Sequence, residues 1–245
     1  MAGSLIHGST TIHYLDEFEV TCALNAADIA IDRGVIDART FCGNNQVPGN
    51  RDSMMSFGGF GLFGADDYEE ELAARMQSGA NVNRLTIFGN AAAARVYEIL
   101  GPLGKASHAW KAAEILGLSG EIPKGQSLTR GVALHVNSTF TATGAQTGQQ
   151  HEVTAATTQV CVATIRVKSV SGAGSVTFVV QESQNDGGGD PYANIATMSA
   201  TFTAPGIQRL TVSSATELWK RINISAFSGF TNVVATMIVG TQMPA

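Results

Sequence analysis

Residues Ile36–Gly64 read I-D-A-R-T-F-C-G-N-N-Q-V-P-G-N-R-D-S-M-M-S-F-G-G-F-G-L-F-G. The stretch begins with a strand-like pattern, opens into a segment rich in Gly, Asn and Pro, and ends in closely spaced glycines. A loop of this length inside a compact domain is uncommon and usually has a function. It contains no His and one Cys, and its adjacent charged pair is Arg51 and Asp52. We therefore predict a loop that contacts another protein rather than one that performs chemistry.

The composition is poor in charge for a chain of this length. Of 245 residues, 44% are hydrophobic and only 14% are charged, whereas about a quarter charged is usual in soluble domains. A charge-poor surface suits repeated contact between copies, and it equally suits a plain β-sandwich. The net charge of −5 arises in residues 1–150, because residues 151–245 hold five acids and five Lys or Arg. This acidic first part argues against a groove that grips nucleic acid, which needs basic residues, but it allows a conduit through which DNA slides.

The cysteines and the N-terminus indicate the cellular compartment in which the chain folds. Cys22, Cys42 and Cys161 are odd in number and lack the spacing of metal ligands, so they predict neither a disulfide framework nor a zinc site. The N-terminus has no basic and apolar signal pattern, and the apolar runs are too short to span a membrane. We expect folding and assembly in a cytoplasm, with no membrane insertion.

One segment matches a cofactor motif by its letters. Gly59–Gly64 fits G-x-G-x-x-G, a pattern that binds a dinucleotide when the following helix presents its positive N-terminus to the pyrophosphate. Here five acids occupy residues 66–71 and would repel a phosphate. We interpret the glycines as bends in a strand or at its end. No nucleophile elbow, Walker loop or zinc-protease motif occurs in the sequence, so we predict no cofactor and no enzymatic activity.

Two further sets of residues could be metal ligands. His7 and His13 are either a metal pair or histidines on a strand surface, and no third ligand repeats their spacing. Asp28, Asp32 and Asp37 could form a carboxylate cluster on a helix. The β-branched residues between them favour two short strands instead, joined by a turn at residues 32–34.

The local patterns predict a mainly β chain with one flanking helix over about residues 66–78. Asp66 or Asp67 can cap this helix, and Gly79 is placed to end it. Residues 81–88 alternate as a strand does. Residues 91–116 have a helix-favouring composition, and helix or strand stays open there.

The C-terminal part is predicted to be a β-sandwich. Strands are expected at about 158–168, 175–182, 194–203, 207–213, 218–225 and 231–239, with period-2 alternation within them. The polar segment 137–150 reads as a linker or a polar hairpin, and we expect a domain boundary near residue 150. Asp186 and Asp190 flank three glycines, which is typical of a hairpin tip and also compatible with a calcium loop.

Several short motifs resemble those of phage tail tube proteins. They are T-F-C-G, V-P-G-N-R-D and S-F-G-G-F between residues 40 and 60, and R-G-V-A-L at Arg130–Leu134. In that family an extended arm runs from a strand through a turn into a second strand. The resemblance implies that residues 1–150 form a tail-tube β-barrel or sandwich, with the arm at about residues 40–56. It also implies that residues 96–100 and much of 106–118 are strands. It assigns contact between subunits and rings to these arm residues: Thr40, Phe41, Cys42, Gly43, Asn44, Asn45, Val47, Pro48, Gly49, Arg51 and Asp52.

The same resemblance implies the function. The chain would be the major tail tube protein of a long phage tail, assembled in the host cytoplasm into stacked hexameric rings of the virion. The lumen would hold the tape-measure protein and pass DNA without sequence-specific binding. Residues 151–245 look like the small jelly-roll domain carried by some phage tail proteins, a decoration that would contact host-surface glycans through Tyr192 and Trp219.

The main alternative is a carbohydrate-binding β module. Exposed aromatic residues stack on sugars, which again points to Tyr192 and Trp219. Another virion part, such as a capsid decoration or head–tail joining protein, is a third reading.

Overall fold

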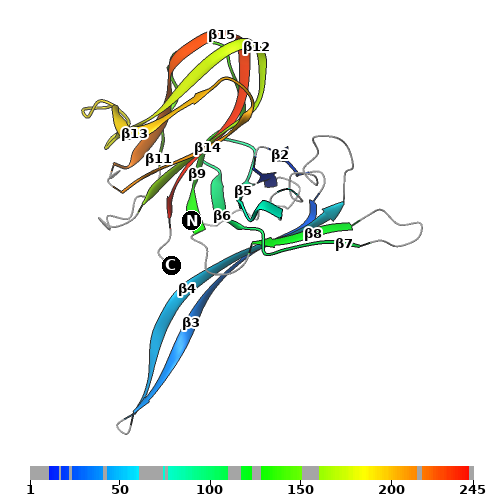
Figure 1. Ribbon diagram of the computed structural model, residues 1–245. Helices are drawn as coiled ribbons and strands as arrows, with labels where there is room; N and C mark the ends of the chain where they lie inside the picture. Colours follow the sequence, from blue (N-terminus) through cyan, green and yellow to red (C-terminus); the bar gives the residue numbers. More distant parts are fainter. Residues whose placement is uncertain are drawn as a thin grey trace. The chain divides into compact units, whose positions relative to one another are not determined.

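A computed structural model describes residues 11–16, 18–21, 24–40, 43–60, 74, 77–109, 117–122, 128–150, 160–213 and 217–242 (Figure 1). These residues are mainly β, as the sequence predicted. The expected flanking helix is not seen as an element. Ala74, Gln77 and Ser78 are helical, and the rest of 66–78 lies outside the described residues.

The chain divides into two compact units that interleave along the sequence. Unit 1 comprises Met1–Glu19, Leu85–Glu98 and Thr129–Gln242, and unit 2 comprises Val20–Arg84, Ile99–Leu128 and Met243–Ala245. Residues 129–150 therefore belong to the same unit as the C-terminal strands. A functional boundary near residue 150 stays a prediction.

The larger sheet is antiparallel, and most of its residues belong to unit 1. Its strand order is β13-β12-β15-β9-β6-β5-β1-β2, with β10 and β11 paired to β15 and β14 paired to β12. The bounds of these strands are β1 Thr11–Leu15, β2 Phe18–Glu19, β5 Asn81–Phe88, β6 Arg95–Pro102, β9 Leu128–Phe140, β10 Gly144–Ala145, β11 Gln149–Gln150, β12 Cys161–Ser183, β13 Ala193–Phe202, β14 Gly206–Val212 and β15 Trp219–Gln242.

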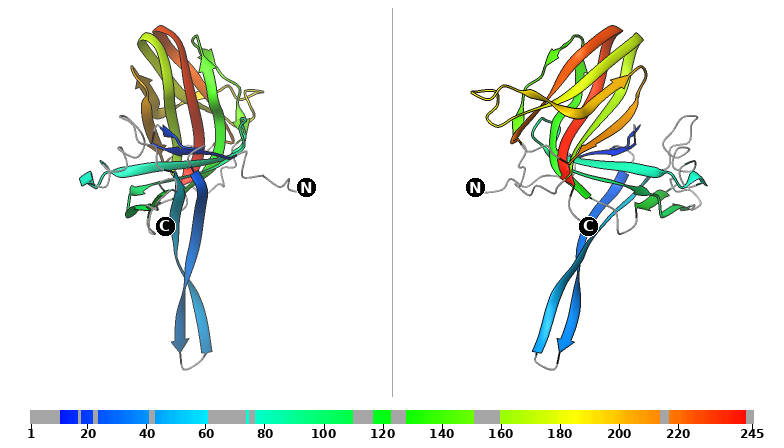
Figure 2. Two further views of the ribbon diagram at one scale, coloured as in Figure 1. Left: turned by 90° about the vertical axis from the view of Figure 1, so that its right-hand side faces the viewer. Right: turned by 60° about the vertical axis from the view of Figure 1, so that its left-hand side comes forward.

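The two longest strands, β12 and β15, each contribute to both layers of a sandwich (Figures 1 and 2). The first part of β12 pairs with β14 and with the end of β15, while its second part pairs with β13 and with the start of β15. Apolar residues from both parts, among them Ile165, Phe178, Ile224 and Met237, meet in one buried core. The C-terminal part is thus of the β-sandwich class.

The prediction of six separate C-terminal strands was wrong in one respect. The two expected strands on either side of residues 169–174 are one strand, β12, and those on either side of residues 226–230 are one strand, β15. Gly172 and Gly229 have positive φ of 97° and 74°, and a Cβ at Gly174 would lie 1.9 Å from the Ser228 carbonyl oxygen. These glycines bend a paired ribbon through bulges and do not end it.

A second apolar layer lies on the other face of β9 and β15. Ala133 and Ile238 pack there with Tyr14, Leu85 and Val96. Neighbouring Leu134 and Val239 face the sandwich core instead, so these strand segments are buried on both faces, which explains their continuous apolar runs.

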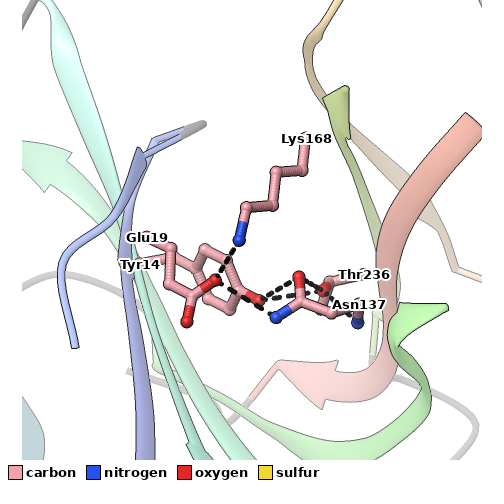
Figure 3. A network of polar contacts seen from close by, with 5 residues as sticks. All are labelled: Tyr14, Glu19, Asn137, Lys168 and Thr236. Atoms are coloured by element: carbon pink, nitrogen blue, oxygen red, sulfur yellow. Dashed lines mark hydrogen bonds and ion pairs between the residues drawn. The ribbon is translucent and has the colours of Figure 1, made fainter. Parts of the chain in front are cut away.

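The N-terminal hairpin β1–β2 is tied to the sheet by a polar network (Figure 3). Asp16, with a φ of +48°, lies in the turn of this hairpin. The hairpin pairs Tyr14 with Glu19. The Tyr14 hydroxyl lies 2.9 Å from Thr236 Oγ1 and donates to Asn137 Oδ1 at 3.1 Å. Burial raises the pKa of Tyr14. Because the polar groups of Tyr14, Asn137 and Thr236 bond to one another, we interpret the network as structural: it fixes the hairpin to the sheet.

The carboxylate of Glu19 closes this network at its exposed end. It accepts hydrogen bonds from Asn137 Nδ2 at 3.1 Å and from Lys168 Nζ at 2.7 Å, as Figure 3 shows. The three residues come from β2, β9 and β12, so the contact joins segments far apart in the sequence.

Unit 2 contains a second sheet of order β3-β4-β8-β7. Its strands are β3 Leu24–Thr40, β4 Gly43–Phe60, β7 Lys105–Ala109 and β8 Gly117–Ile122. Among the described residues of 91–116, β6 and β7 are strands, and residues 91–94 and 103–104 are not. For β6 the tertiary reason is burial, since Val96 and Ile99 are fully enclosed and β-branched residues suit a packed sheet surface.

Candidate functional site

The predicted arm is a long β-hairpin made by β3 and β4. The pairs run from Leu24↔Gly59 at the base to Thr40↔Gly43 near the tip. β4 also pairs with β8, but only over Met55–Phe60. Beyond that point the two strands pair only with each other among the described residues. We call residues 30–54 the arm; Figure 2 shows it as a two-stranded twisted ribbon.

The long loop predicted within Ile36–Gly64 is a strand over much of its length. Gly43–Phe60 forms β4 and pairs with β3. The turn expected at residues 32–34 is absent, because Asp32 pairs with Asp52 and the ladder continues to Val35↔Pro48 past a bulge. Val35 and Ile36 carried the missed signal, since consecutive β-branched residues favour a continuing strand.

The predicted contact residues lie together at the far end of this hairpin. Thr40 ends β3, whereas Gly43, Asn44, Asn45, Val47, Pro48, Gly49, Arg51 and Asp52 all belong to β4. Phe41 and Cys42 lie outside the described residues. Their contact with other subunits remains a prediction.

The base of the arm is firmly packed in unit 2. Met55 and Phe57 are buried. The guanidinium of Arg84, fully buried as well, lies 5.3 Å from the Phe57 ring centroid and donates to the Ser56 carbonyl oxygen. A Cβ at Gly120 would lie 2.3 Å from the Phe57 ring, so glycine there leaves room for this ring. Such a base holds the root of the arm in one place.

The two predicted glycan-contact residues have different surroundings. Tyr192 is half-buried, with the Arg221 guanidinium 3.9 Å from its ring centroid. Its hydroxyl donates to Asp186 Oδ1 at 2.6 Å, and burial together with that bond raises its pKa. Trp219 begins β15 and is also half-buried, opposite Ser183. One face of the Tyr192 ring is thus already stacked, and glycan contact stays a prediction.

The loop between β12 and β13 is a hairpin tip whose carboxylates serve the loop itself. Asp190 Oδ2 accepts from the Gln184 amide at 2.8 Å, and Asp186 holds Tyr192. Ser183 Oγ accepts from the Gly187 amide at 2.8 Å. Within the described residues no group of three or more His, Cys, Asp or Glu side chains is arranged to hold a metal ion.

The other groups singled out in the sequence are structural where they are described. His13 lies 3.2 Å from Thr86 Oγ1, while its proposed partner His7 lies outside the described residues. The ring of His135 packs edge-on against the ring of Phe140, with 5.2 Å between the ring centroids. Cys161 is a buried free thiol whose pKa burial raises to about 11. None of the helical residues that the structure describes forms a helix long and apolar enough to cross a membrane.

No protein-family model and no curated protein matches the chain. Among solved structures, a chain of the virion of a native gene transfer agent particle aligns at 14% identity and a TM-score of 0.40, over 50% of this chain and 95% of that one. The SPP1 Dit protein, described as a hub adsorption apparatus of phages that infect Gram-positive hosts, aligns at 10% identity and a TM-score of 0.28, over 95% and 99% of the two chains. At these TM-scores neither likeness assigns a family or a function.

Proposed function

We propose that this chain is a structural subunit of a phage tail, the major tail tube protein, whose copies join through the arm. The observation that carries the proposal is the hairpin of β3 and β4, which are 17 and 18 residues long. Most strands have about 3 to 10 residues. Beyond the segment of β4 that pairs with β8, this ribbon pairs with nothing else in the described chain, which suits a contact with another chain.

The physical reason is the state of its edges. Each arm strand has one edge without a strand partner among the described residues, and open edges are sites where another chain adds. A two-stranded hairpin is also marginally stable by itself in water. A packed base at Phe57 and an unsupported outer part suit an element that becomes ordered against a neighbouring subunit.

The motifs that resemble tail tube proteins fall on this element. Thr40 and Gly43 of T-F-C-G end β3 and begin β4, V-P-G-N-R-D lies along β4, and S-F-G-G-F ends β4. By that resemblance the copies form hexameric rings that stack, with the tape-measure protein and DNA in the lumen. The acidic excess of residues 1–150 fits a lumen that DNA passes without being held.

The test shortens the arm without disturbing its base. Replacing residues 34–50 by Asn-Gly leaves Arg33↔Arg51 as the last pair and closes the hairpin with a favoured two-residue turn. We expect circular dichroism and the melting temperature to match those of the full chain. Negative-stain electron microscopy of concentrated protein should show rings or tubes for the full chain and only single particles for the shortened one.

Rings or tubes of the shortened chain that equal those of the full chain would contradict the role of the arm. A glycan-binding activity in a full chain that forms no assemblies would favour the carbohydrate-binding module.

A further inference from the structure

The outer face of one sandwich layer in unit 1 carries a row of joined polar side chains. In the strand register, Gln181 of β12 lies between Asn194 of β13 and Arg221 of β15. Arg221 Nε donates to Gln181 Oε1 at 2.7 Å, and Gln181 Nε2 donates to Asn194 Oδ1 at 2.8 Å. Val180 and Ile222, their neighbours along β12 and β15, belong to the sandwich core. Because successive side chains of a strand alternate between its faces, the row faces away from that core.

The guanidinium of Arg221 is held in place without a carboxylate. Besides its bond to Gln181, it lies 3.9 Å from the ring centroid of Tyr192, whose hydroxyl is in turn fixed by Asp186. Arg221 belongs to none of the ion pairs among the described residues. Neither its Nη groups nor Nδ2 of Asn194 donate to a described residue. The row thus presents a fixed positive charge and hydrogen-bond donors that the described chain leaves unused.

The face around this row is otherwise uncharged over the described strands. Trp219 and Asn223, both half-buried, lie on the same side of β15 as Arg221, two residues away in each direction. The register places five uncharged residues of β12 and β13 beside them: Thr177, Val179, Ser183, Ser199 and Thr201. A nucleic acid or an anionic lipid surface needs several basic residues. A single arginine suits one acidic group within a polar ligand.

Two irregular backbone segments border the row at Asn194. On one side is the hairpin tip of residues 184–192. On the other side, residues 195–198 lie opposite Val180 alone, and the exposed Thr197 has a φ of +70°. A left-handed backbone is an outlier for a β-branched residue. Loops, bulges and strained residues gather at functional sites, so their position marks the row as a binding site.

We propose that this row binds a carboxylate-bearing saccharide, with Arg221 on the carboxylate and the amides of Gln181 and Asn194 on hydroxyl groups. The planar guanidinium matches a carboxylate in a forked geometry. Side-chain amides donate and accept hydrogen bonds, as sugar hydroxyls do. Trp219 offers a rigid apolar surface beside Arg221 for the C–H groups of a sugar ring.

An acidic peptide fits the row less well, because its backbone groups would also need partners. At this row the backbone of β12 is already paired with β13 on one side and with β15 on the other. A peptide lying on the face would lose water from its amides without gaining those hydrogen bonds.

The inference is separate from the two earlier assignments. Tyr192 supports Arg221 here, whereas the aromatic pattern predicted direct contact of Tyr192 with a glycan. The row belongs to unit 1 and the arm belongs to unit 2, so the saccharide site does not depend on assembly through the arm.

The test titrates the full chain with a tetrasaccharide of galacturonic acid and with its methyl ester, followed by isothermal titration calorimetry. The ester keeps the rings and hydroxyl groups but removes the negative charges. We expect saturable binding of the acid and at least about tenfold weaker binding of the ester, since hydrogen bonds between charged groups are the stronger ones. R221Q should bind the acid about as weakly as it binds the ester.

Two further variants separate charge from geometry. R221K keeps the charge but loses the fork, so its affinity for the acid should lie between those of R221Q and the unmodified protein. R130Q is the matched control, because it removes one positive charge at an exposed residue of β9. It should bind like the unmodified protein, and circular dichroism should show the same fold for every variant.

Absent saturation by the acid, equal affinity for acid and ester, or an equal loss in R130Q overturns the inference. The first two outcomes concern the unmodified chain, so they decide the matter even if R221Q misfolds. Hexaglutamate that binds as tightly as the saccharide and loses binding in R221Q would make the row a peptide site instead. None of these results bears on the proposed function, which the chain shortened at residues 34–50 tests.

Discussion

His135 is the residue at which the core of unit 1 depends on protonation. It lies in β9 opposite Met237, and its Nε2 is buried without a hydrogen-bond partner among the described residues. Burial lowers its pKa, because the charged imidazolium would have to leave water. The neutral imidazole is therefore favoured more strongly in the folded chain than in the unfolded chain.

The pH dependence of stability follows from that shift. Below about pH 6.5 the histidine of the unfolded chain takes up a proton that the folded chain does not. The free energy of unfolding should therefore fall as pH drops below this value, and level off once His135 is protonated in the folded state. Chemical denaturation of the H135F variant, which keeps an aromatic ring beside Phe140, should show a weaker loss over the same range. Parallel curves for the two proteins would exclude His135 as the cause.

The bend shared by β12 and β15 is the feature of unit 1 that depends most on single glycines. Gly229 has a φ of +74°, and a Cβ there would lie 2.2 Å from the Ala173 carbonyl oxygen. Both the left-handed backbone and the overlap with a backbone atom oppose any side chain. The two layers of the sandwich remain connected through this bend.

For the G229A variant we expect a loss of about 2–4 kcal/mol in the free energy of unfolding, from left-handed strain and overpacking together. Denaturant titration measures it. S228A, at the exposed neighbouring position, should stay within about 0.5 kcal/mol of the unmodified protein. Equal stability of G229A and S228A would mean that the ribbon bends by another route.

At the scale of the whole molecule, the arm should respond to assembly differently from the sandwich. In an antiparallel pair, alternate amides of each strand point to the partner and the others point outward. The outward amides of residues 30–40 and 43–54 have no strand partner in the described chain. Hydrogen exchange of the free subunit should therefore be fast for about half of the arm amides.

Assembly should slow the exchange of these outward amides, whereas amides of β12 and β15 should be protected in both states. Mass spectrometry with residue-resolving fragmentation measures the difference. Arm amides that exchange equally fast in the assembled form would argue that the arm is not an interface.

The sequence by itself determined the β class and the strand at 81–88. Those properties depend on period-2 alternation and on turn residues, which act within a few positions. The glycine of the R-G-V-A-L motif is a related case. A Cβ at Gly131 would lie 1.9 Å from the Val239 carbonyl oxygen, but only the pairing of β9 with β15 reveals why.

Only the tertiary structure decided whether a glycine ends a strand or bends it. Gly34, Gly172 and Gly229 all read locally as turns, yet each lies within a paired strand, because the ladder hydrogen bonds on both sides outweigh the local preference. Burial likewise made a strand of Arg95–Pro102, although residues 91–116 have a helix-favouring composition. The pairing of β3 with β4 along both strands is likewise a long-range property that no local pattern contains.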